Sequence, residues 1–87
     1  MEVTSEFHGL ILHSRGTLSD SELHEIQEFV EGRDFTLALE TLCGFLVDQN
    51  RGVTRELYLR IHSLGERLDG VDPVLLEGVK AIVISAD

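Results

Sequence analysis

Hydrophobic residues recur at helical spacing along most of the chain. Four segments show this pattern, and a fifth follows the single proline: residues 2–14, 20–31, 35–49, 54–69 and the stretch that begins at Pro73. The densest apolar face belongs to the third segment and consists of Phe35, Ala38, Leu39, Leu42, Phe45 and Leu46. This pattern predicts an all-α fold, a small four- to five-helix bundle that forms one helical domain over residues 1–87.

Residues that can cap free backbone N–H groups precede several of these segments. Ser19 is followed three residues later by Glu22, the spacing of a capping box. Asp34 precedes the third segment and Thr54 the fourth, and both side chains are good N-caps. Asp72 precedes the proline, which is favoured in a first helical turn. We therefore expect these side chains to fix where the helices begin.

Three glycines carry structural predictions. Gly32 suits the left-handed residue that ends many helices, and Gly52 is expected to supply the turn after the third segment. Gly65 lies beside the apolar stripe of the fourth segment, where a glycine costs about 1 kcal/mol relative to alanine. We therefore expect another helix to approach closely at Gly65.

The end of the chain is ambiguous. Its apolar spacing from Val74 to Ile82 fits a helix, whereas "AIVIS" at 81–85 is rich in β-branched residues and could extend into a strand. One strand alone cannot satisfy its backbone groups inside a helical domain. We therefore favour a short helix with a frayed or partner-dependent end over residues 80–87.

Charge is the strongest compositional signal, with 16 acidic and 7 basic residues and a formal net charge of −9. Such a field repels nucleic-acid backbones and attracts cationic surfaces, so we expect a basic protein partner and no nucleic acid. An acidic surface also keeps a small protein soluble, which is the simpler interpretation.

One cysteine fits a reducing compartment, and no apolar run approaches the ~20 residues of a membrane span. We therefore expect a cytoplasmic protein that does not bind a membrane.

Residues that could carry chemistry are dispersed. Cys43 lies beside Leu42 with no cation within one helical turn to stabilise a thiolate, so a packed, unreactive thiol is expected. The histidines lack the i, i+3 or i, i+4 pairs of helical metal sites; they are His8, His13, His24 and His62. No nucleophile elbow, phosphate loop or dinucleotide fingerprint occurs. We therefore predict no enzyme activity, no cofactor and no metal.

The segment "DSEL" at 20–23 has a partial likeness to the Asp-Ser-Leu of a phosphopantetheine site. Glu22 interrupts that motif, and too little chain precedes it to form the long first helix of an acyl carrier protein. A carrier protein is therefore disfavoured. If the chain were one, Ser21 would carry a phosphopantetheine group.

A series of motifs between residues 22 and 70 is similar to a known family. An acidic helix ends in F-V-E-G, and D-F-x-L-A-L-E-T-L-C, L-V-D-Q-N and V-T-R-E-L-Y-x-x-I-x-x-L-G-x-x-L follow. This order resembles the MafI-type immunity proteins of bacterial polymorphic toxin systems, and also the small helical immunity proteins of contact-dependent inhibition. The matching positions are mostly apolar: Ala38, Leu39, Glu40, Leu42, Ile61, Leu64 and Gly65.

The resemblance implies a protein that binds the C-terminal domain of a cognate toxin and blocks its active site or its access to substrate. Toxins of such systems are often nucleases with basic clefts, which agrees with the partner expected from charge. The candidate toxin-binding residues are Asp20, Glu22, Glu25, Glu28, Glu31, Asp48, Glu56 and Tyr58. Glu40 is expected to be structural, either as a cap or paired with Arg55 or Arg60.

The alternative is a helical adaptor or dimerisation module with no toxin partner. In that case Leu37, Leu59 and the apolar end of the chain would form a self-interface. The sequence leaves open the identity of the toxin, the mode of inhibition and the formation of a homodimer.

Overall fold

The computed structural model describes residues 2–84, and its regular structure is helical. Five helices lie in that range: α1 (Val3–Ser14), α2 (Asp20–Glu31), α3 (Phe35–Asp48), α4 (Arg55–Arg67) and α5 (Pro73–Ala81). The all-α prediction is confirmed, and the fifth segment is a helix.

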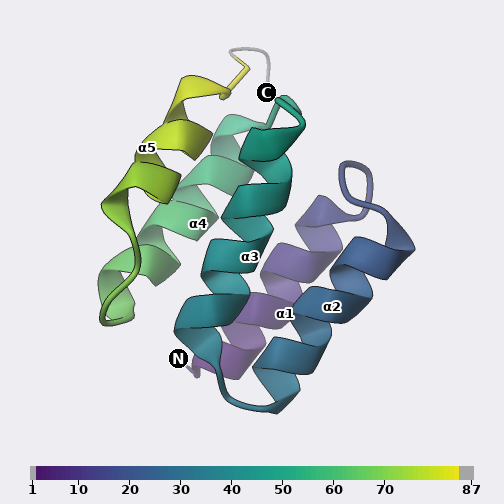
Figure 1. Ribbon diagram of the computed structural model, residues 1–87, viewed down its shortest axis with the longest axis vertical. Coiled ribbons are helices and arrows are strands. Elements are labelled where there is room, and N and C mark those ends of the chain that lie inside the picture. The colour runs from purple at the N-terminus through teal and green to yellow at the C-terminus, as the bar shows by residue number, and fades with distance from the viewer. Residues whose placement is uncertain (1, 85–87) are drawn as a thin grey trace.

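α3 is the helix around which the others are arranged (Figure 1). It lies between α2 and α5 and makes its most extensive contacts with them, while α1 packs against α4 and α2 behind it. The buried face of α3 explains this position, because Leu39, Leu42 and Leu46 are each no more than 1% exposed. Burying a leucine stabilises the fold by about 1.5–3 kcal/mol, so α3 carries a large share of the core.

Side chains from all five helices complete the core, among them Phe7, Leu10, Ile26, Ile61, Leu64 and Val79. Phe7 of α1 stacks on Phe35 at the start of α3, with ring centroids 5.8 Å apart. Phe35 and Phe45 are only partly buried, although the periodicity assigns both to the core face. The stripe on α3 is therefore narrower than predicted.

Three of the four predicted caps form. The N–H of Glu22 donates to Ser19 Oγ (3.2 Å) and the N–H of Ser19 donates to Glu22 Oε1 (2.9 Å), which completes the capping box. Thr54 and Asp72 each accept a backbone N–H, at 3.1 and 2.9 Å. Asp34 occupies the N-cap position of α3, but its side chain accepts no capping bond. Its ψ of 65° is far from the extended value of the other caps, so this prediction is wrong.

The predicted roles of Gly32 and Gly52 in the turns are also wrong. Gly32 has a φ of −82°, and the left-handed residue after α2 is Arg33, with a φ of 63°. After α3 the left-handed residue is Asn50, with a φ of 49°. In both turns the next residue donates its N–H to the carbonyl five positions earlier, at 2.9 and 3.0 Å. This pattern of a Schellman motif satisfies the helix end, and here it does so without glycine.

The C-terminal segment after α5 pairs with the loop before α4. The N–H of Val53 donates to Ile82 O (3.1 Å) and the N–H of Ile84 donates to Val53 O (2.8 Å), which forms a parallel bridge between Val53 and Val83. A Cβ at Gly52 would lie 2.9 Å from Ile84 Cγ2, so Gly52 lets this segment approach closely. The expectation of a frayed or partner-dependent end over residues 80–87 misses this pairing, and residues 85–87 of that end lie outside the described residues.

Close helix packing at Gly65 is confirmed. A Cβ at this position would lie 3.1 Å from Leu76 of α5. Gly78 of α5 plays the same part towards α3, since a Cβ there would lie 3.0 Å from Val47. Two small residues therefore let α5 pack tightly against the rest of the bundle.

Candidate protein-binding surface

The negative charge of the chain is concentrated in the part that forms α2 and α3. Residues 20–48 contain eight acidic residues and one arginine, a net charge of −7. The rest of the chain contains eight acidic and six basic residues, a net charge of −2. Neither α2 nor α3 contains a lysine or an arginine. A strong acidic field therefore surrounds one side of the bundle.

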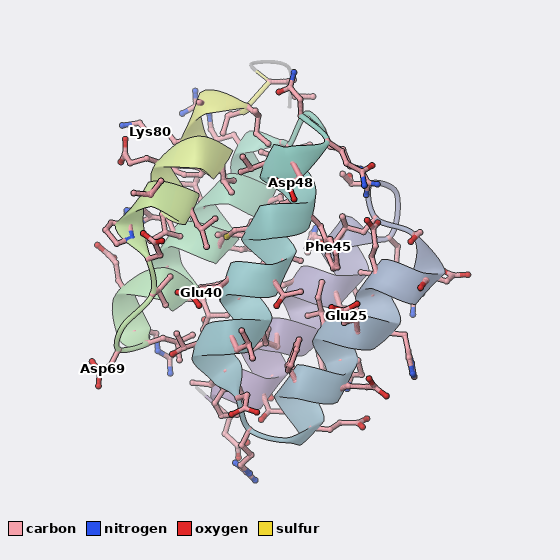
Figure 2. The ribbon with its side chains drawn as sticks, viewed as in Figure 1. Glu25, Glu40, Phe45, Asp48, Asp69 and Lys80 are labelled. Carbon is pink, nitrogen blue, oxygen red and sulfur yellow. The ribbon has the colours of Figure 1, made fainter. Side chains whose placement is uncertain are left out.

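The exposed carboxylates of α2 are distributed around its outer side. Glu25, Glu28 and Glu31 are exposed, and because each follows the last by three residues, each step turns about 60° around the helix. Glu31 accepts a bond from Gln27 (3.5 Å), which also lines a hollow against α1. Glu25 lies on the other edge, beside α3 (Figure 2). Asp20 is exposed in the first turn.

The outer face of α3 continues this acidic surface. Asp48 and Phe45 lie on the same side of the molecule as Glu25 (Figure 2). Leu37, near the start of the same helix, is 45% exposed. The structure therefore adds apolar groups to the predicted carboxylates. Sequence reasoning missed Phe45 as a surface residue because it falls at the edge of the apolar stripe.

Carboxylates in the last turns of α2 and α3 oppose the dipoles of these helices. The last turn of α2 contains Glu28 and Glu31, that of α3 ends in Asp48, and neither turn has a basic residue. The other three helices each have a basic residue in the last turn: His13, Arg67 and Lys80. A charge of the wrong sign at a helix end costs about 0.3–1 kcal/mol. The carboxylates in the last turns of α2 and α3 therefore reduce local stability.

Glu22, unlike its neighbours on α2, is engaged inside the molecule. Its carboxylate accepts bonds from Arg51 Nη1 (2.7 Å) and Nη2 (3.3 Å), and Arg51 Nη1 also donates to the carbonyl of Thr17 (2.8 Å). The bond from Arg51, together with the backbone bond from Ser19, holds the pKa of Glu22 below its usual range. Glu22 therefore joins the loop before α2 to the loop after α3, and it is a structural residue rather than part of the exposed surface.

Glu56 and Tyr58 lie on α4, away from the surface formed by α2 and α3. The carboxylate of Glu56 is 3.2 Å from Arg60 and 3.6 Å from His13 of α1. Tyr58 is partly buried against the core, with its ring 5.8 Å from that of His62. Of the predicted residues, five are exposed on α2 or α3, namely Asp20, Glu25, Glu28, Glu31 and Asp48, whereas Glu22, Glu56 and Tyr58 have structural contacts or lie on another helix.

Cys43 and Glu40 on α3 have structural roles. Cys43 is fully buried, and burial, with a smaller effect of the Glu40 charge, raises the pKa of its thiol to about 12. A thiol with so high a pKa is a poor nucleophile, which agrees with the expected packing role. Glu40 accepts the backbone N–H of Asp72 (3.0 Å), and Thr36 donates to Asp69 O (2.8 Å). Glu40 therefore helps to hold the loop between α4 and α5 on α3.

Two open hollows lie against α1. One of them, of about 350 Å³, lies between α1 and α4 and is lined by Glu6, Glu56, Leu59, Arg60 and Ser63. Across the described part of the chain, no three His, Cys, Asp or Glu side chains converge to form a metal site. Within residues 2–84 no helix has both the length and the apolar character needed to cross a bilayer.

No protein-family model, curated protein or solved structure matches this chain. The resemblance to immunity proteins therefore stays a prediction. An argument about function has to rest on the surface formed by α2 and α3, and on the way its charges differ from those elsewhere in the molecule.

Proposed function

We propose that this chain is an immunity protein that binds a basic toxin domain through the acidic surface of α2 and α3 and so prevents the toxin from acting. The observation that supports this proposal most strongly is the charge arrangement of residues 20–48. They hold a net charge of −7, and α2 and α3 contain no lysine or arginine.

The energetic consequence of this arrangement favours a binding role. Glu25, Glu28 and Glu31 repel one another along α2, and like charges at this spacing cost a few tenths of a kcal/mol per pair, about 0.2–0.5. A partner with lysines or arginines facing them removes that cost on binding. Proteins commonly accept a loss of stability at a site that function requires.

The same charges suit a rapid encounter with a cationic cleft. An acidic surface opposite a basic one raises the association rate well above the ~10⁵–10⁶ M⁻¹s⁻¹ of uncharged surfaces. Carboxylates on such a surface can occupy the positions that a nuclease reserves for the phosphates of its substrate. Both effects serve a protein that has to neutralise a toxin before the toxin acts.

The resemblance to immunity proteins supports the fold of this proposal more than its site. Its apolar positions are buried in the structure, among them Ala38, Leu39, Leu42, Ile61 and Leu64. Buried positions determine how helices pack, whereas partner choice depends on exposed residues. The motif therefore supports a scaffold of this kind, and the exposed carboxylates support the partner.

The test is coexpression with the C-terminal domain of the secreted protein encoded immediately upstream. The wild-type protein should bind that domain and protect cells from it, and Glu25→Lys with Glu28→Lys should weaken both effects. The matched control is Glu2→Lys with Glu66→Lys, which makes the same change in net charge at exposed positions just before α1 and on α4. Failure of the wild-type protein to bind or protect contradicts the proposal.

The alternative of an adaptor or dimerisation module has weaker support. Leu37, Leu59 and Ile84 are 45%, 54% and 47% exposed, as a self-interface requires. However, Leu37 lies on α3 at the front of the bundle, whereas Leu59 lines the hollow between α4 and α1 behind it (Figure 1). Light scattering at high protein concentration separates the two functions, because the module requires a dimer.

A further inference from the structure

Four glycines lie inside helices, and one of them has no neighbour that requires it. A Cβ would meet Leu76 at 3.1 Å from Gly65 and Val47 at 3.0 Å from Gly78. From Gly9 it would meet the Arg60 guanidinium at 3.4 Å. A Cβ on Gly44 would meet nothing within 4 Å. Gly44 therefore serves no close packing contact within the chain.

The backbone gives no reason for this glycine either. Gly44 is absent from the positive-φ residues of the chain, and α3 continues without interruption from Phe35 to Asp48. Glycine is the least favourable residue in a helix interior apart from proline. The chain therefore keeps a destabilising residue at a position where alanine would fit.

The surroundings of Gly44 are those of the acidic surface. Phe45 follows it, and Asp48 lies one turn further along the same helix. Glu25 of the adjacent α2 lies on the same side of the molecule as Phe45 and Asp48 (Figure 2). A small open position therefore stands beside a partly exposed aromatic ring and exposed carboxylates.

We propose that Gly44 is the point at which the backbone of the basic partner comes closest to α3, with Phe45 as an apolar contact and Glu25 and Asp48 as charged contacts beside it. This inference rests on the proposed function. A glycine admits a partner's main chain to a distance that a side chain would prevent, and aromatic residues are frequent centres of binding energy.

Charge complementarity identifies the occupant as a cationic protein. α2 and α3 present carboxylates without lysine or arginine, so a nucleic acid or an anionic membrane is repelled from this face. A second copy of this chain would bring another net charge of −9. A surface rich in lysine and arginine is the partner that these groups fit.

The test uses the full-length chain and the toxin domain encoded immediately upstream. The variants are Gly44→Leu, which fills the open position, and Gly44→Ala, which adds one methyl group. The control is Ser63→Leu, which adds the same side chain at an exposed position of α4. Circular dichroism and the unfolding midpoint report whether each variant folds.

Gly44→Leu should weaken binding of the toxin domain by tenfold or more, while Ser63→Leu changes it by less than threefold. Gly44→Ala should raise the unfolding midpoint and still weaken binding severalfold, a combination that misfolding does not produce. Unchanged binding in both Gly44 variants, with weakened binding in the Glu25→Lys and Glu28→Lys double variant, overturns this inference and leaves the proposed function standing. If the wild-type protein does not bind the domain, both fail.

Discussion

α2 and α4 are helices of similar length with charged outer sides, but they treat their charges in opposite ways. α4 has Glu56 in its first turn and Arg67 in its last, the arrangement that its dipole favours. Glu56 lies 3.2 Å from Arg60, and Arg67 pairs with Glu6 of α1. The charges of α4 therefore contribute to the fold.

α2 also has carboxylates in its first turn, Asp20 and Glu22, but it has no cation in its last turn. Glu22 pairs with Arg51. Glu28 lies 3.4 Å from the imidazole of the exposed His24, but the last turn of α2 contains carboxylates and no lysine or arginine. A carboxylate paired with an arginine of the chain contributes to the fold, whereas an exposed carboxylate without a lysine or arginine partner can attract a cationic molecule. This difference is why the proposed function assigns partner binding to α2 rather than to α4.

Leu42→Ala should have the largest effect on stability, because Leu42 lies in the core of α3, the helix against which α2, α4 and α5 pack. Leu42 is 1% exposed on the central helix, and truncation of such a leucine costs about 2–5 kcal/mol. Denaturant unfolding should show a loss in this range and a fall in toxin binding that follows the loss of folded protein. A variant of undiminished stability would show that α3 is not the centre of the core.

Arg51→Ala separates Glu22 from the other carboxylates of α2. It leaves a partly buried carboxylate without its cation and should lower the free energy of unfolding by about 2 kcal/mol. Glu25→Ala, at an exposed position on the same helix, should change it by less than about 0.5 kcal/mol. Equal effects in the two variants would remove the distinction between structural and exposed carboxylates.

The dependence of stability on pH should also distinguish Glu22 from the exposed carboxylates. The pKa of Glu22 is lower in the folded protein than its ordinary value of 4.5, so the unfolded chain binds more protons in the range between the two. Stability from this group is therefore complete above about pH 4.5 and is lost as pH falls through the folded value. Unfolding measured from pH 7 to pH 3 should show a shallower decline in Glu22→Gln, which starts from a lower stability. Parallel curves would contradict this role.

Reversing a charge in the last turn should change stability in opposite directions in α2 and α4. Glu31→Lys relieves repulsion from Glu28 and complements the dipole of α2, so it should stabilise the protein by about 0.5 kcal/mol. Arg67→Glu opposes the dipole of α4 and loses the pair with Glu6, so it should destabilise by about 1 kcal/mol. Thermal unfolding measures both. Effects of the same sign would contradict the contrast between the helices.

The apolar spacing predicted all five helices because it depends on local periodicity, which the core then reinforces. Capping by Ser19, Thr54 and Asp72 was predictable for the same reason. The left-handed Arg33 was not, because a turn that links two packed helices can impose a conformation that an arginine rarely adopts.

The candidate surface was predictable only in part. An acidic outer side of α2 follows from periodicity and residue type. Whether a given carboxylate is exposed depends on contacts distant in sequence, such as the one between Glu22 and Arg51, 29 positions apart. The same limit applies to Gly44, whose lack of neighbours becomes visible only when the helices around α3 are in place.

The central claim is that the exposed carboxylates on α2 and α3 that lack a lysine or arginine partner are the binding surface. Its most direct test is the association rate with the upstream-encoded toxin domain, measured over a range of ionic strength. Wild-type association should slow markedly with salt, and Glu25→Lys with Glu28→Lys should lower the low-salt rate about tenfold or more and flatten its salt dependence. The Glu2→Lys and Glu66→Lys control should keep most of the wild-type rate. Equal losses in the two double variants, or no loss in either, would contradict the account.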